Sequence, residues 1–381
     1  MIYADNAATT KISDVAFSGM LPFLQDQYGN PSSPYSFGTK AKRAIGQARQ
    51  LVASAIGAQT DEITFTSGGS EGNSWVLRSI VDIYNNKPLH VIISTIEHSS
   101  IMSACRILES KGIEITYLPV DHLGRISINN LKSAIRPNTK LVSIMFANNE
   151  IGTIQPIAEI GRYLSKMDLL FHTDAVQAVG HIPINVKELN VDFLTASAHK
   201  FNGAKGTGIL YKRPGLDFYP LVFGGGQENG FRGGTENVAG IVAAGYALDE
   251  NVSIMNDTTK LLNELVDITI EGIENRIPNL RINGDIDNGL PGIINFCFDG
   301  ISGDSLVHLL DFKGICISTS SACMSGENKP SHVLMALGMS GQQARSSIRI
   351  SYGRYNTITD AKCLVDALYL SYSKIKGSIK S

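Results

Sequence analysis

The sequence predicts an α/β protein with a largely parallel sheet, followed by a smaller α+β domain. Short apolar runs typical of buried strands alternate with segments whose apolar residues recur at helical spacing. Parallel strands need such crossover helices, which cover the faces of the sheet. The length of 381 residues is enough for two or three domains that bury a large core.

The first helix with clear periodicity is expected from Thr39 to Ile56, and a second from Trp75 to Ile83. The strands expected in the first domain are Ile63–Phe65, Val91–Ser94, Leu141–Phe146, Leu169–His172, Val191–Thr195 and Gly208–Tyr211. Ligands of such sheets bind beyond the carboxyl ends of the strands, so the residues that follow each run are the candidates for a site.

The pattern changes near Asn256. A long amphipathic stretch comes first, and a final helical pattern covers Asp360 to Ile375. The strand-like runs between them are Ile293–Phe298, Gly314–Ser318 and Ser347–Ser351. This second part of the chain is therefore expected to be a smaller α+β domain.

Composition excludes several classes of protein. The 33 Lys and Arg against 35 Asp and Glu are not the balance of an electrostatic nucleic-acid binder. Hydrophobic residues at 43% and charged residues at 18% exclude a disordered chain. No apolar run reaches the roughly 18 residues of a membrane span, and no signal-peptide pattern opens the chain. Five scattered Cys without a CxxC pair predict neither a disulfide framework nor a metal site, and so favour the cytoplasm.

The segment from Thr66 to Asn73, TSGGSEGN, joins an expected strand to an expected helix. Its glycines let main-chain N–H groups approach an anion, and the start of a helix adds partial positive charge. Alone, the segment favours an ordinary glycine-rich turn. It matches neither the Walker pattern nor the dinucleotide pattern, so it does not indicate a mononucleotide.

Lys200, in the motif SAHK, follows another expected strand. A lysine in a crowded pocket has a lowered pKa and can form a Schiff base with an aldehyde, although a surface loop is the alternative for this motif alone. Asp174 follows the preceding strand, where a carboxylate can hold a ring nitrogen protonated. Together with the glycine-rich segment and with His98 to stack on a ring face, these residues predict a pyridoxal phosphate site.

Cys323 differs from the other four cysteines. It lies among small polar residues without periodicity, a setting typical of an exposed loop and suited to a nucleophilic thiolate. The cysteines expected to be inert packing within helical or strand patterns are Cys105, Cys297, Cys316 and Cys363. Cys323 is therefore the candidate nucleophile, and an incidental surface thiol is the alternative.

Nine motifs, in order along almost the whole chain, resemble those of the NifS/IscS-type cysteine desulfurases. They are Tyr3–Thr10, Gly29–Ser33, Thr66–Asn73, Glu97–His98, Asn148–Glu150, His172–Gln177, Ser197–Lys200, Gly224–Glu228 with Arg232–Thr235, and Ser321–Cys323. The resemblance implies the PLP-dependent transferase fold type I, with a mostly parallel seven-stranded sheet in a large domain, a smaller α+β domain, and a homodimer. The implied large domain is 13–255, and 1–12 with 256–381 forms the small domain that carries the cysteine loop.

The resemblance also implies roles for residues. Lys200 resembles the Schiff-base lysine, Asp174 the partner of the pyridine nitrogen, and Gln177 the donor to the ring hydroxyl of pyridoxal 5′-phosphate. His98 resembles the ring-stacking histidine and is a candidate proton shuttle. The residues similar to phosphate ligands are Ser70, Ser197 and His199, with Thr235 reaching the phosphate of the other subunit's cofactor. The residues similar to those that hold the substrate carboxylate are Asn149 and Arg349.

The implied reaction removes sulfur from L-cysteine and leaves L-alanine and a persulfide on Cys323. The sulfur would then pass to an acceptor such as an iron–sulfur cluster scaffold protein. The runner-up is a selenocysteine lyase or another fold type I aminotransferase or lyase. A third possibility, from another class, is a catalytically silent scaffold that only docks sulfur-transfer partners.

Overall fold

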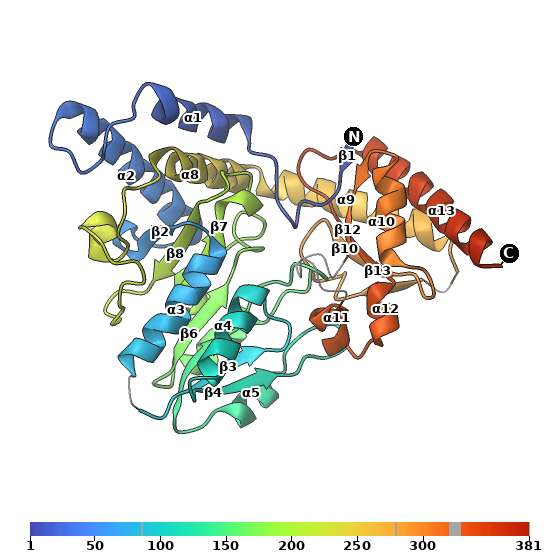
Figure 1. Ribbon diagram of the computed structural model, residues 1–381, viewed down its shortest axis with the longest axis horizontal. Helices are drawn as coiled ribbons and strands as arrows, with labels where there is room; N and C mark the ends of the chain where they lie inside the picture. Colours follow the sequence, from blue (N-terminus) through green and yellow to red (C-terminus); the bar gives the residue numbers. More distant parts are fainter. Residues whose placement is uncertain (85–86, 279, 320–328, 381) are drawn as a thin grey trace.

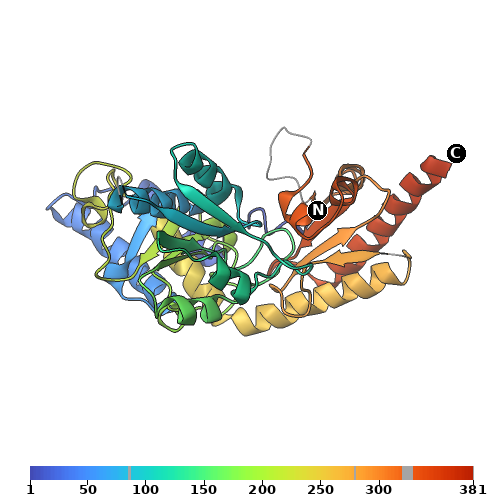
Figure 2. The ribbon, with the colours of Figure 1, turned by 90° about the horizontal axis from the view of Figure 1, so that it is seen from below.

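A computed structural model describes residues 1–84, 87–278, 280–319 and 329–380 of the chain. Figure 1 shows a large unit, formed by the first two thirds of the chain, beside a small unit formed by the last third. Helix α9 (Met255–Glu274) starts next to the large unit and runs along the edge of the small one (Figure 2). No helix in the described part of the chain could span a membrane.

The large unit is built on a seven-stranded sheet in the order β2-β8-β7-β6-β5-β3-β4. Its strands are β2 (Ile63–Thr66), β3 (His90–Ser94), β4 (Glu114–Leu118), β5 (Thr139–Ser143), β6 (Leu170–Asp174), β7 (Phe193–Ser197) and β8 (Gly208–Lys212). Among these described strands β8 is antiparallel to both of its neighbours, β2 and β7, and all the other strand pairs are parallel. The mostly parallel seven-stranded sheet is therefore confirmed.

Helices cover both faces of this sheet. They are α1 (Asp14–Gln25), α2 (Ser36–Ile56), α3 (Gly69–Ile83), α4 (Ser99–Glu109), α5 (Ile128–Ala134), α6 (Ile157–Leu164), α7 (Val186–Leu189) and α8 (Val238–Ser253). In strand β3, Ile92 packs in a core cluster with α2 and α8, whereas Val91 and Ile93 pack in another with α3 and α4. Because successive side chains of a strand point to opposite faces, the sheet lies between two helical layers.

The small unit contains a four-stranded antiparallel sheet in the order β12-β13-β10-β9. Its strands are β9 (Arg281–Asn283), β10 (Ile293–Cys297), β12 (Ser318–Thr319) and β13 (Ser347–Ser351). Its helices besides α9 are α10 (Gly303–Asp311), α11 (His332–Ala336), α12 (Gly341–Arg345) and α13 (Ile358–Lys380). This mixture is the smaller α+β part that the sequence predicts.

The beginning of the chain belongs to the small unit. Strand β1 (Ile2–Tyr3) pairs in parallel with β11 (Ile315–Cys316), and Ala4 is buried in the hydrophobic cluster of the small unit. The two units thus have separate cores. We therefore propose the domain division 13–255 for the large domain, with 1–12 and 256–381 for the small one.

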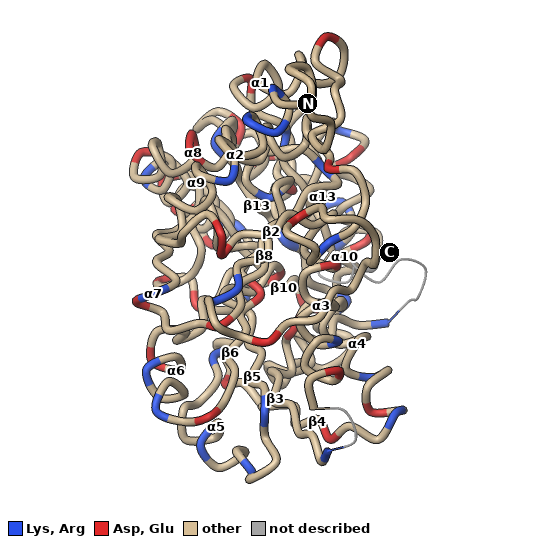
Figure 3. Tube along the Cα trace, turned by 90° about the vertical axis from the view of Figure 1, so that its left-hand side faces the viewer, with Lys and Arg blue, Asp and Glu red and all other residues tan. Residues whose placement is uncertain are grey.

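Charges of both signs are mixed along the chain. Figure 3 shows Lys and Arg interspersed with Asp and Glu, without a large region of one sign on the side in view. An extended basic stripe is the usual footprint of nucleic-acid binding. The distribution therefore agrees with the small net charge of −2.

The contact between α6 and α7 provides a test of the fold. A Cβ on Gly161 would overlap the main-chain carbonyl of Leu189, so the two helices can approach this closely only at a glycine. We expect Gly161→Ala to lower the free energy of unfolding by about 1–3 kcal/mol or more, as overpacking does. Gly46 is a matched control, since its Cβ would meet no atom within 4 Å. Gly46→Ala should raise stability by about 0.5–1 kcal/mol. Urea unfolding of both variants checks this, and equal stabilities would contradict it.

Candidate active site

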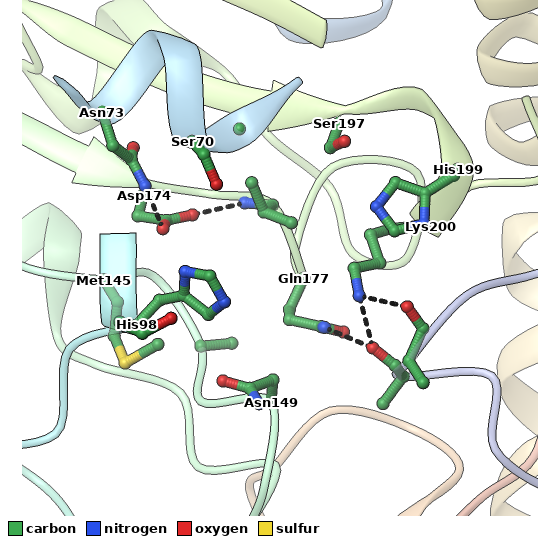
Figure 4. A pocket seen from close by; sticks show the side chains of 16 residues that line it. Ser70, Asn73, His98, Met145, Asn149, Asp174, Gln177, Ser197, His199 and Lys200 are labelled. Carbon is green, nitrogen blue, oxygen red and sulfur yellow. Dashed lines mark hydrogen bonds between the residues drawn. The ribbon is translucent and has the colours of Figure 1, made fainter. Parts of the chain in front are cut away.

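A cavity of about 410 Å³ lies at the carboxyl ends of the parallel strands. Its lining brings together candidate residues from the ends of three strands and the starts of two helices (Figure 4). Eight predicted site residues line it, and the motif residue Asn73 lines it too. The eight are Ser70, His98, Asn149, Asp174, Gln177, Ser197, His199 and Lys200. The position is where ligands of such sheets bind.

Ser70 belongs to a glycine-rich turn in which two main-chain segments nearly touch. Helix α3 starts at Gly69, directly after β2. A Cβ on Gly208 of β8 would lie 2.5 Å from Cα of Gly68, and a Cβ on Gly69 would lie 2.6 Å from the side chain of Val176. Only glycines permit this packing. The first N–H groups of the 15-residue helix, like those of any helix, have no intrahelical partners. Such a helix start can hold a phosphate.

Asp174 ends strand β6, with only 5% of its surface exposed. Its Oδ2 accepts a hydrogen bond of 2.6 Å from Nδ2 of Asn73, and its Oδ1 accepts one of 3.0 Å from the main-chain N–H of Val176. The carboxylate is therefore held in one orientation at the cavity wall. The sequence motif contains Asn73, but its role as the partner of Asp174 was not predicted.

His98 occupies the cap position before helix α4, and its side chain accepts a hydrogen bond of 3.2 Å from the main-chain N–H of Ser100. Burial lowers the pKa of His98. The charge of Asp174 opposes this shift of the pKa, and the charge of Lys200 adds to it. The ring is thus favoured in its neutral form.

Lys200 is the last residue of a short 3₁₀ helix (Ala198–Lys200) that follows β7. Its Nζ donates hydrogen bonds of 2.6 Å to the carbonyl of Ala7 and 2.7 Å to that of Ala8. Gln177 donates from Nε2 to the same carbonyl of Ala7, at 3.0 Å. The motif Tyr3–Thr10 thus contributes main-chain acceptors to the site, a role that its side chains do not reveal.

His199 and Ser197 come shortly before Lys200 in the chain and also line the cavity. Nδ1 of His199 lies 3.1 Å from Oγ1 of Thr9. Burial lowers the pKa of His199 to about 4, and the charges of Lys200 and Lys205 add to this effect. At neutral pH His199 is therefore uncharged and can donate a single N–H to an anion.

Asn149 lines the cavity, but Arg349 lies behind it and does not. Arg349 is 2% exposed and donates from Nη1 to the carbonyl of Asn149 at 2.8 Å. Its Nη2 donates to Oδ1 of Asp5 at 2.6 Å, as part of an ion pair. The structure therefore places the guanidinium beside the cavity, already paired with a carboxylate.

Thr235 is not brought to this cavity within one chain. It lines a separate pocket of about 80 Å³ together with Thr66, Ser67 and Arg232. Cys323, the candidate nucleophile, lies outside the described residues. Among the predicted residues that the structure describes, Thr235 thus stands apart, and Arg349 lies next to the cavity without lining it.

The residues present fit pyridoxal phosphate. A phosphate matches the helix start at Gly69, a pyridine nitrogen matches the oriented carboxylate of Asp174, and an aldehyde matches the amine of Lys200. All three features border the same cavity. Fold and site together define a PLP-dependent enzyme of fold type I.

Comparisons with known proteins agree. The family model for class V aminotransferases matches residues 2–364. Cysteine desulfurase IscS of Dictyoglomus turgidum is 46% identical over 375 residues, which cover 98% of this chain and 95% of the relative. A solved NifS-like protein superposes with a TM-score of 0.92 at 36% identity, covering 98% of this chain and 99% of its own. SspA, solved in complex with cysteine, superposes with a TM-score of 0.84 at 37% identity. The match covers 94% of this chain and 100% of the SspA chain.

The chain belongs to the NifS/IscS family of cysteine desulfurases, within the class V aminotransferases. Its cofactor is pyridoxal phosphate, as the sequence predicts. The predicted fold type and family are confirmed.

The buried carboxyl of Glu97, next to His98, predicts a pH effect on stability. Burial raises the pKa of Glu97 from 4.5 to about 8, although Ser94 and the main-chain N–H of Met145 donate hydrogen bonds to it. The folded protein therefore binds a proton that the unfolded chain releases, and this carboxyl costs stability increasingly from about pH 4.5 to about pH 8.

Glu97→Gln removes that ionisation. We expect its free energy of unfolding, relative to wild type, to be higher at pH 8.5 than at pH 5 by about 1 kcal/mol or more. Glu264, which is exposed on α9, is the control, and Glu264→Gln should show no such difference. Urea titrations at both pH values measure the effect. A pH-independent difference between Glu97→Gln and wild type would show that Glu97 is ionised in the folded protein.

Proposed function

We propose that this enzyme removes sulfur from L-cysteine, releases L-alanine and keeps the sulfur as a persulfide on Cys323. The observation that supports Cys323 most directly concerns the described residues on either side of segment 320–328. Both sides contact residues that lie next to the lining of the cavity, beside those proposed to hold the cofactor and the substrate.

Strand β12 comes just before this segment, and its Ser318 pairs directly with Arg349 of β13. After the segment, Ser331 donates a 2.5 Å hydrogen bond to Oε2 of Glu150, the neighbour of Asn149. Nε2 of His332 lies 2.9 Å from the carbonyl of Glu97, the neighbour of His98. The described residues before and after segment 320–328 are thus both anchored next to the proposed substrate site.

The other cysteines are poor candidates. None of Cys105, Cys297, Cys316 and Cys363 lines the cavity. Burial raises the pKa of Cys105 to about 12 and also raises that of Cys297, so both thiols resist ionisation. Since a thiolate is the reactive form, this further favours Cys323.

The other proposed roles belong to residues that line the cavity. Bound pyridoxal phosphate supplies an electron-withdrawing ring that stabilises negative charge on the α-carbon of the substrate. Lys200 would hold the cofactor aldehyde, and its Nζ would take the α-proton once the amine of cysteine replaces it. Asp174 would keep the ring nitrogen protonated, and Gln177 would donate to the ring hydroxyl. Ser70, Ser197 and His199 would hold the phosphate.

Asn149 and Arg349 would hold the carboxylate of the substrate. Nη2 of Arg349 now binds Asp5, and no described atom accepts a hydrogen bond from its buried Nε. Arg349 does not line the cavity, so its side chain would have to turn away from Asp5 to reach an incoming carboxylate, a partner that its planar fork suits.

The sulfur transfer is a displacement at sulfur. The thiolate of Cys323 attacks the sulfur of the substrate, so an S–S bond forms and the bond between sulfur and the β-carbon breaks. The electron pair of the broken bond stays on that carbon, which takes up a proton and becomes the methyl group of alanine. The persulfide keeps the sulfur for an acceptor, which we propose to be an iron–sulfur cluster scaffold or another sulfur-acceptor protein.

We further propose a homodimer that works in the cytoplasm. In a single chain Thr235 does not reach the cavity, and the nearby Phe223 leaves 86% of its surface exposed. The exposed side chains of Tyr219 and Val222 are close to it in the chain, and such a cluster of exposed apolar residues favours a protein contact. The unpaired thiols of Cys105, Cys297, Cys316 and Cys363 favour a reducing compartment.

Cys323→Ala tests the nucleophile. This variant should keep the visible absorption of the bound cofactor, because the proposed cofactor ligands are untouched, and it should lose sulfide release from L-cysteine. Cys363→Ala on α13 is the matched control and should retain activity. Sulfide release by Cys323→Ala at the wild-type rate would contradict the assignment and favour the chemistry of a selenocysteine lyase or another enzyme of the fold.

Mixing two inactive variants tests whether Thr235 acts across subunits. Lys200→Ala and Thr235→Ala each damage one component of the site. If Thr235 serves the partner's site, a mixed dimer contains one site with both residues intact. Unfolding and refolding the two variants together should then restore about a quarter of wild-type activity, because half of the dimers are mixed and each regains one of two sites. No recovery in a mixture shown by mass spectrometry to contain mixed dimers would place Thr235 in its own subunit's site.

A further inference from the structure

A continuous chain of hydrogen bonds joins Asp174 to His98 behind the cavity wall. Nδ2 of Asn73 donates to Oδ2 of Asp174 at 2.6 Å and to Oγ of Ser100 at 2.9 Å. Oγ of Ser100 lies 2.9 Å from Nδ1 of His98. Asn73 belongs to α3 and is 1% exposed, and Ser100 belongs to α4. Figure 4 shows Asn73 and Asp174 joined, with His98 beside them.

The chemistry of the groups fixes the direction of this chain. An ionised carboxylate can only accept, so the NH₂ of Asn73 and not its oxygen faces Asp174. The second N–H of the same amide goes to Oγ of Ser100. The hydroxyl proton of Ser100 is then available for Nδ1 of His98, and the main-chain N–H of Ser100 also points at this nitrogen, at 3.2 Å.

Nδ1 of His98 therefore accepts from Ser100, and the ring proton lies on Nε2. A main-chain N–H can only donate, so a proton on Nδ1 would face it directly. His98 can become charged only if the contact to this main-chain N–H is broken and the Ser100 hydroxyl changes from donor to acceptor. This chain of hydrogen bonds thus selects a neutral His98 ring with its proton on Nε2.

We propose that Asn73 and Ser100 are positioning residues that orient the Asp174 carboxylate and hold His98 as a neutral ring protonated on Nε2. This inference rests on the roles proposed above for Asp174 and His98. It also narrows the role of His98, because a ring held in this way stacks and donates from Nε2 but is a poor proton acceptor. The α-proton is then left to Lys200.

The charged and titratable groups around His98 agree. Asp174 faces it from β6, Lys200 from the 3₁₀ helix and His332 from α11, while Glu97 precedes it in the chain. Burial and the charge of Lys200 lower the pKa of His98, whereas the charge of Asp174 raises it. Ser100 adds donors only to one ring nitrogen, so it decides the tautomer where the charges do not.

Ser100→Ala and Ser100→Thr test the proposal, with Ser103→Ala on the exposed side of α4 as the control. The imidazole ¹⁵N signals of the full-length protein, labelled at histidine, are followed against pH with and without pyridoxal phosphate. The spectrum of His98→Gln identifies the signals of His98. Wild type, Ser100→Thr and the control should show the Nε2–H tautomer. Ser100→Ala keeps the main-chain N–H but loses the hydroxyl, so it should show a smaller fraction of this tautomer and a titration midpoint moved to higher pH.

Steady-state kinetics give a second readout. Ser100→Ala should lower kcat about 10-fold, the equivalent of one lost hydrogen bond, without changing KM for cysteine, and Ser100→Thr should restore kcat. An Nδ1–H tautomer in wild type, or identical His98 signals in wild type and Ser100→Ala, would overturn the proposal. The imidazole signals require no turnover, so an error in the proposed function would leave them unchanged.

Asn73→Ala addresses the other end of the chain of hydrogen bonds. Asp174 loses a donor in this variant, so the affinity for pyridoxal phosphate should fall about 10-fold, as is typical when a group that orients a ligand is removed. Equilibrium binding followed by cofactor absorbance measures this. Wild-type affinity in a folded Asn73→Ala protein would count against the proposal, and the Ser100 variants decide it if this buried substitution prevents folding.

Discussion

The first ten residues hold the active site together, because they hydrogen-bond to both units of the protein. On the small unit, the N–H of Ala7 donates to Oγ of Ser351 at 2.9 Å, next to the β1–β11 pairing. On the large unit, the carbonyl of Ala7 accepts from Gln177 and from Lys200. Thr10 then donates from its N–H to the carbonyl of His199 at 2.9 Å. The amine of Lys200 is thus positioned by a segment that is nearly 200 residues away in the sequence.

This arrangement explains which parts of the site were readable from the sequence. Residues that follow a buried strand, such as Asp174 after β6 and Lys200 after β7, could be assigned because parallel strands bring their carboxyl ends to one edge. The pairing of Arg349 with Asp5 joins residues 344 positions apart, and no local pattern signals it. The acceptors at Ala7 and Ala8 are main-chain carbonyls, so their side chains carry no information about the contact.

In the fold, too, features with a local sequence pattern were predictable and the others were not. Strands with buried runs were predicted within a few residues, since continuous apolar sequence marks a strand covered on both faces. Strand β4 was not predicted, because it lies at the edge of the sheet and only Leu118 is buried. Helix α3 begins at Gly69, six residues before the expected start at Trp75, because the glycine-rich segment is itself the first turn. Helical spacing of apolar residues cannot reveal a turn made of glycine and serine.

The electrostatics of the site favour neutral histidines around charged groups that have defined partners. Burial lowers the pKa of His98 and that of His199, and it lowers the pKa of His172, beneath the cavity, to about 3. The phosphate binding proposed for His199 would therefore depend on hydrogen-bond donation more than on charge. The protein as a whole also carries little charge, with a net charge of only −2. An enzyme whose substrate is a small zwitterion needs donors at defined positions, and a strong overall field would not distinguish its carboxylate from its amine.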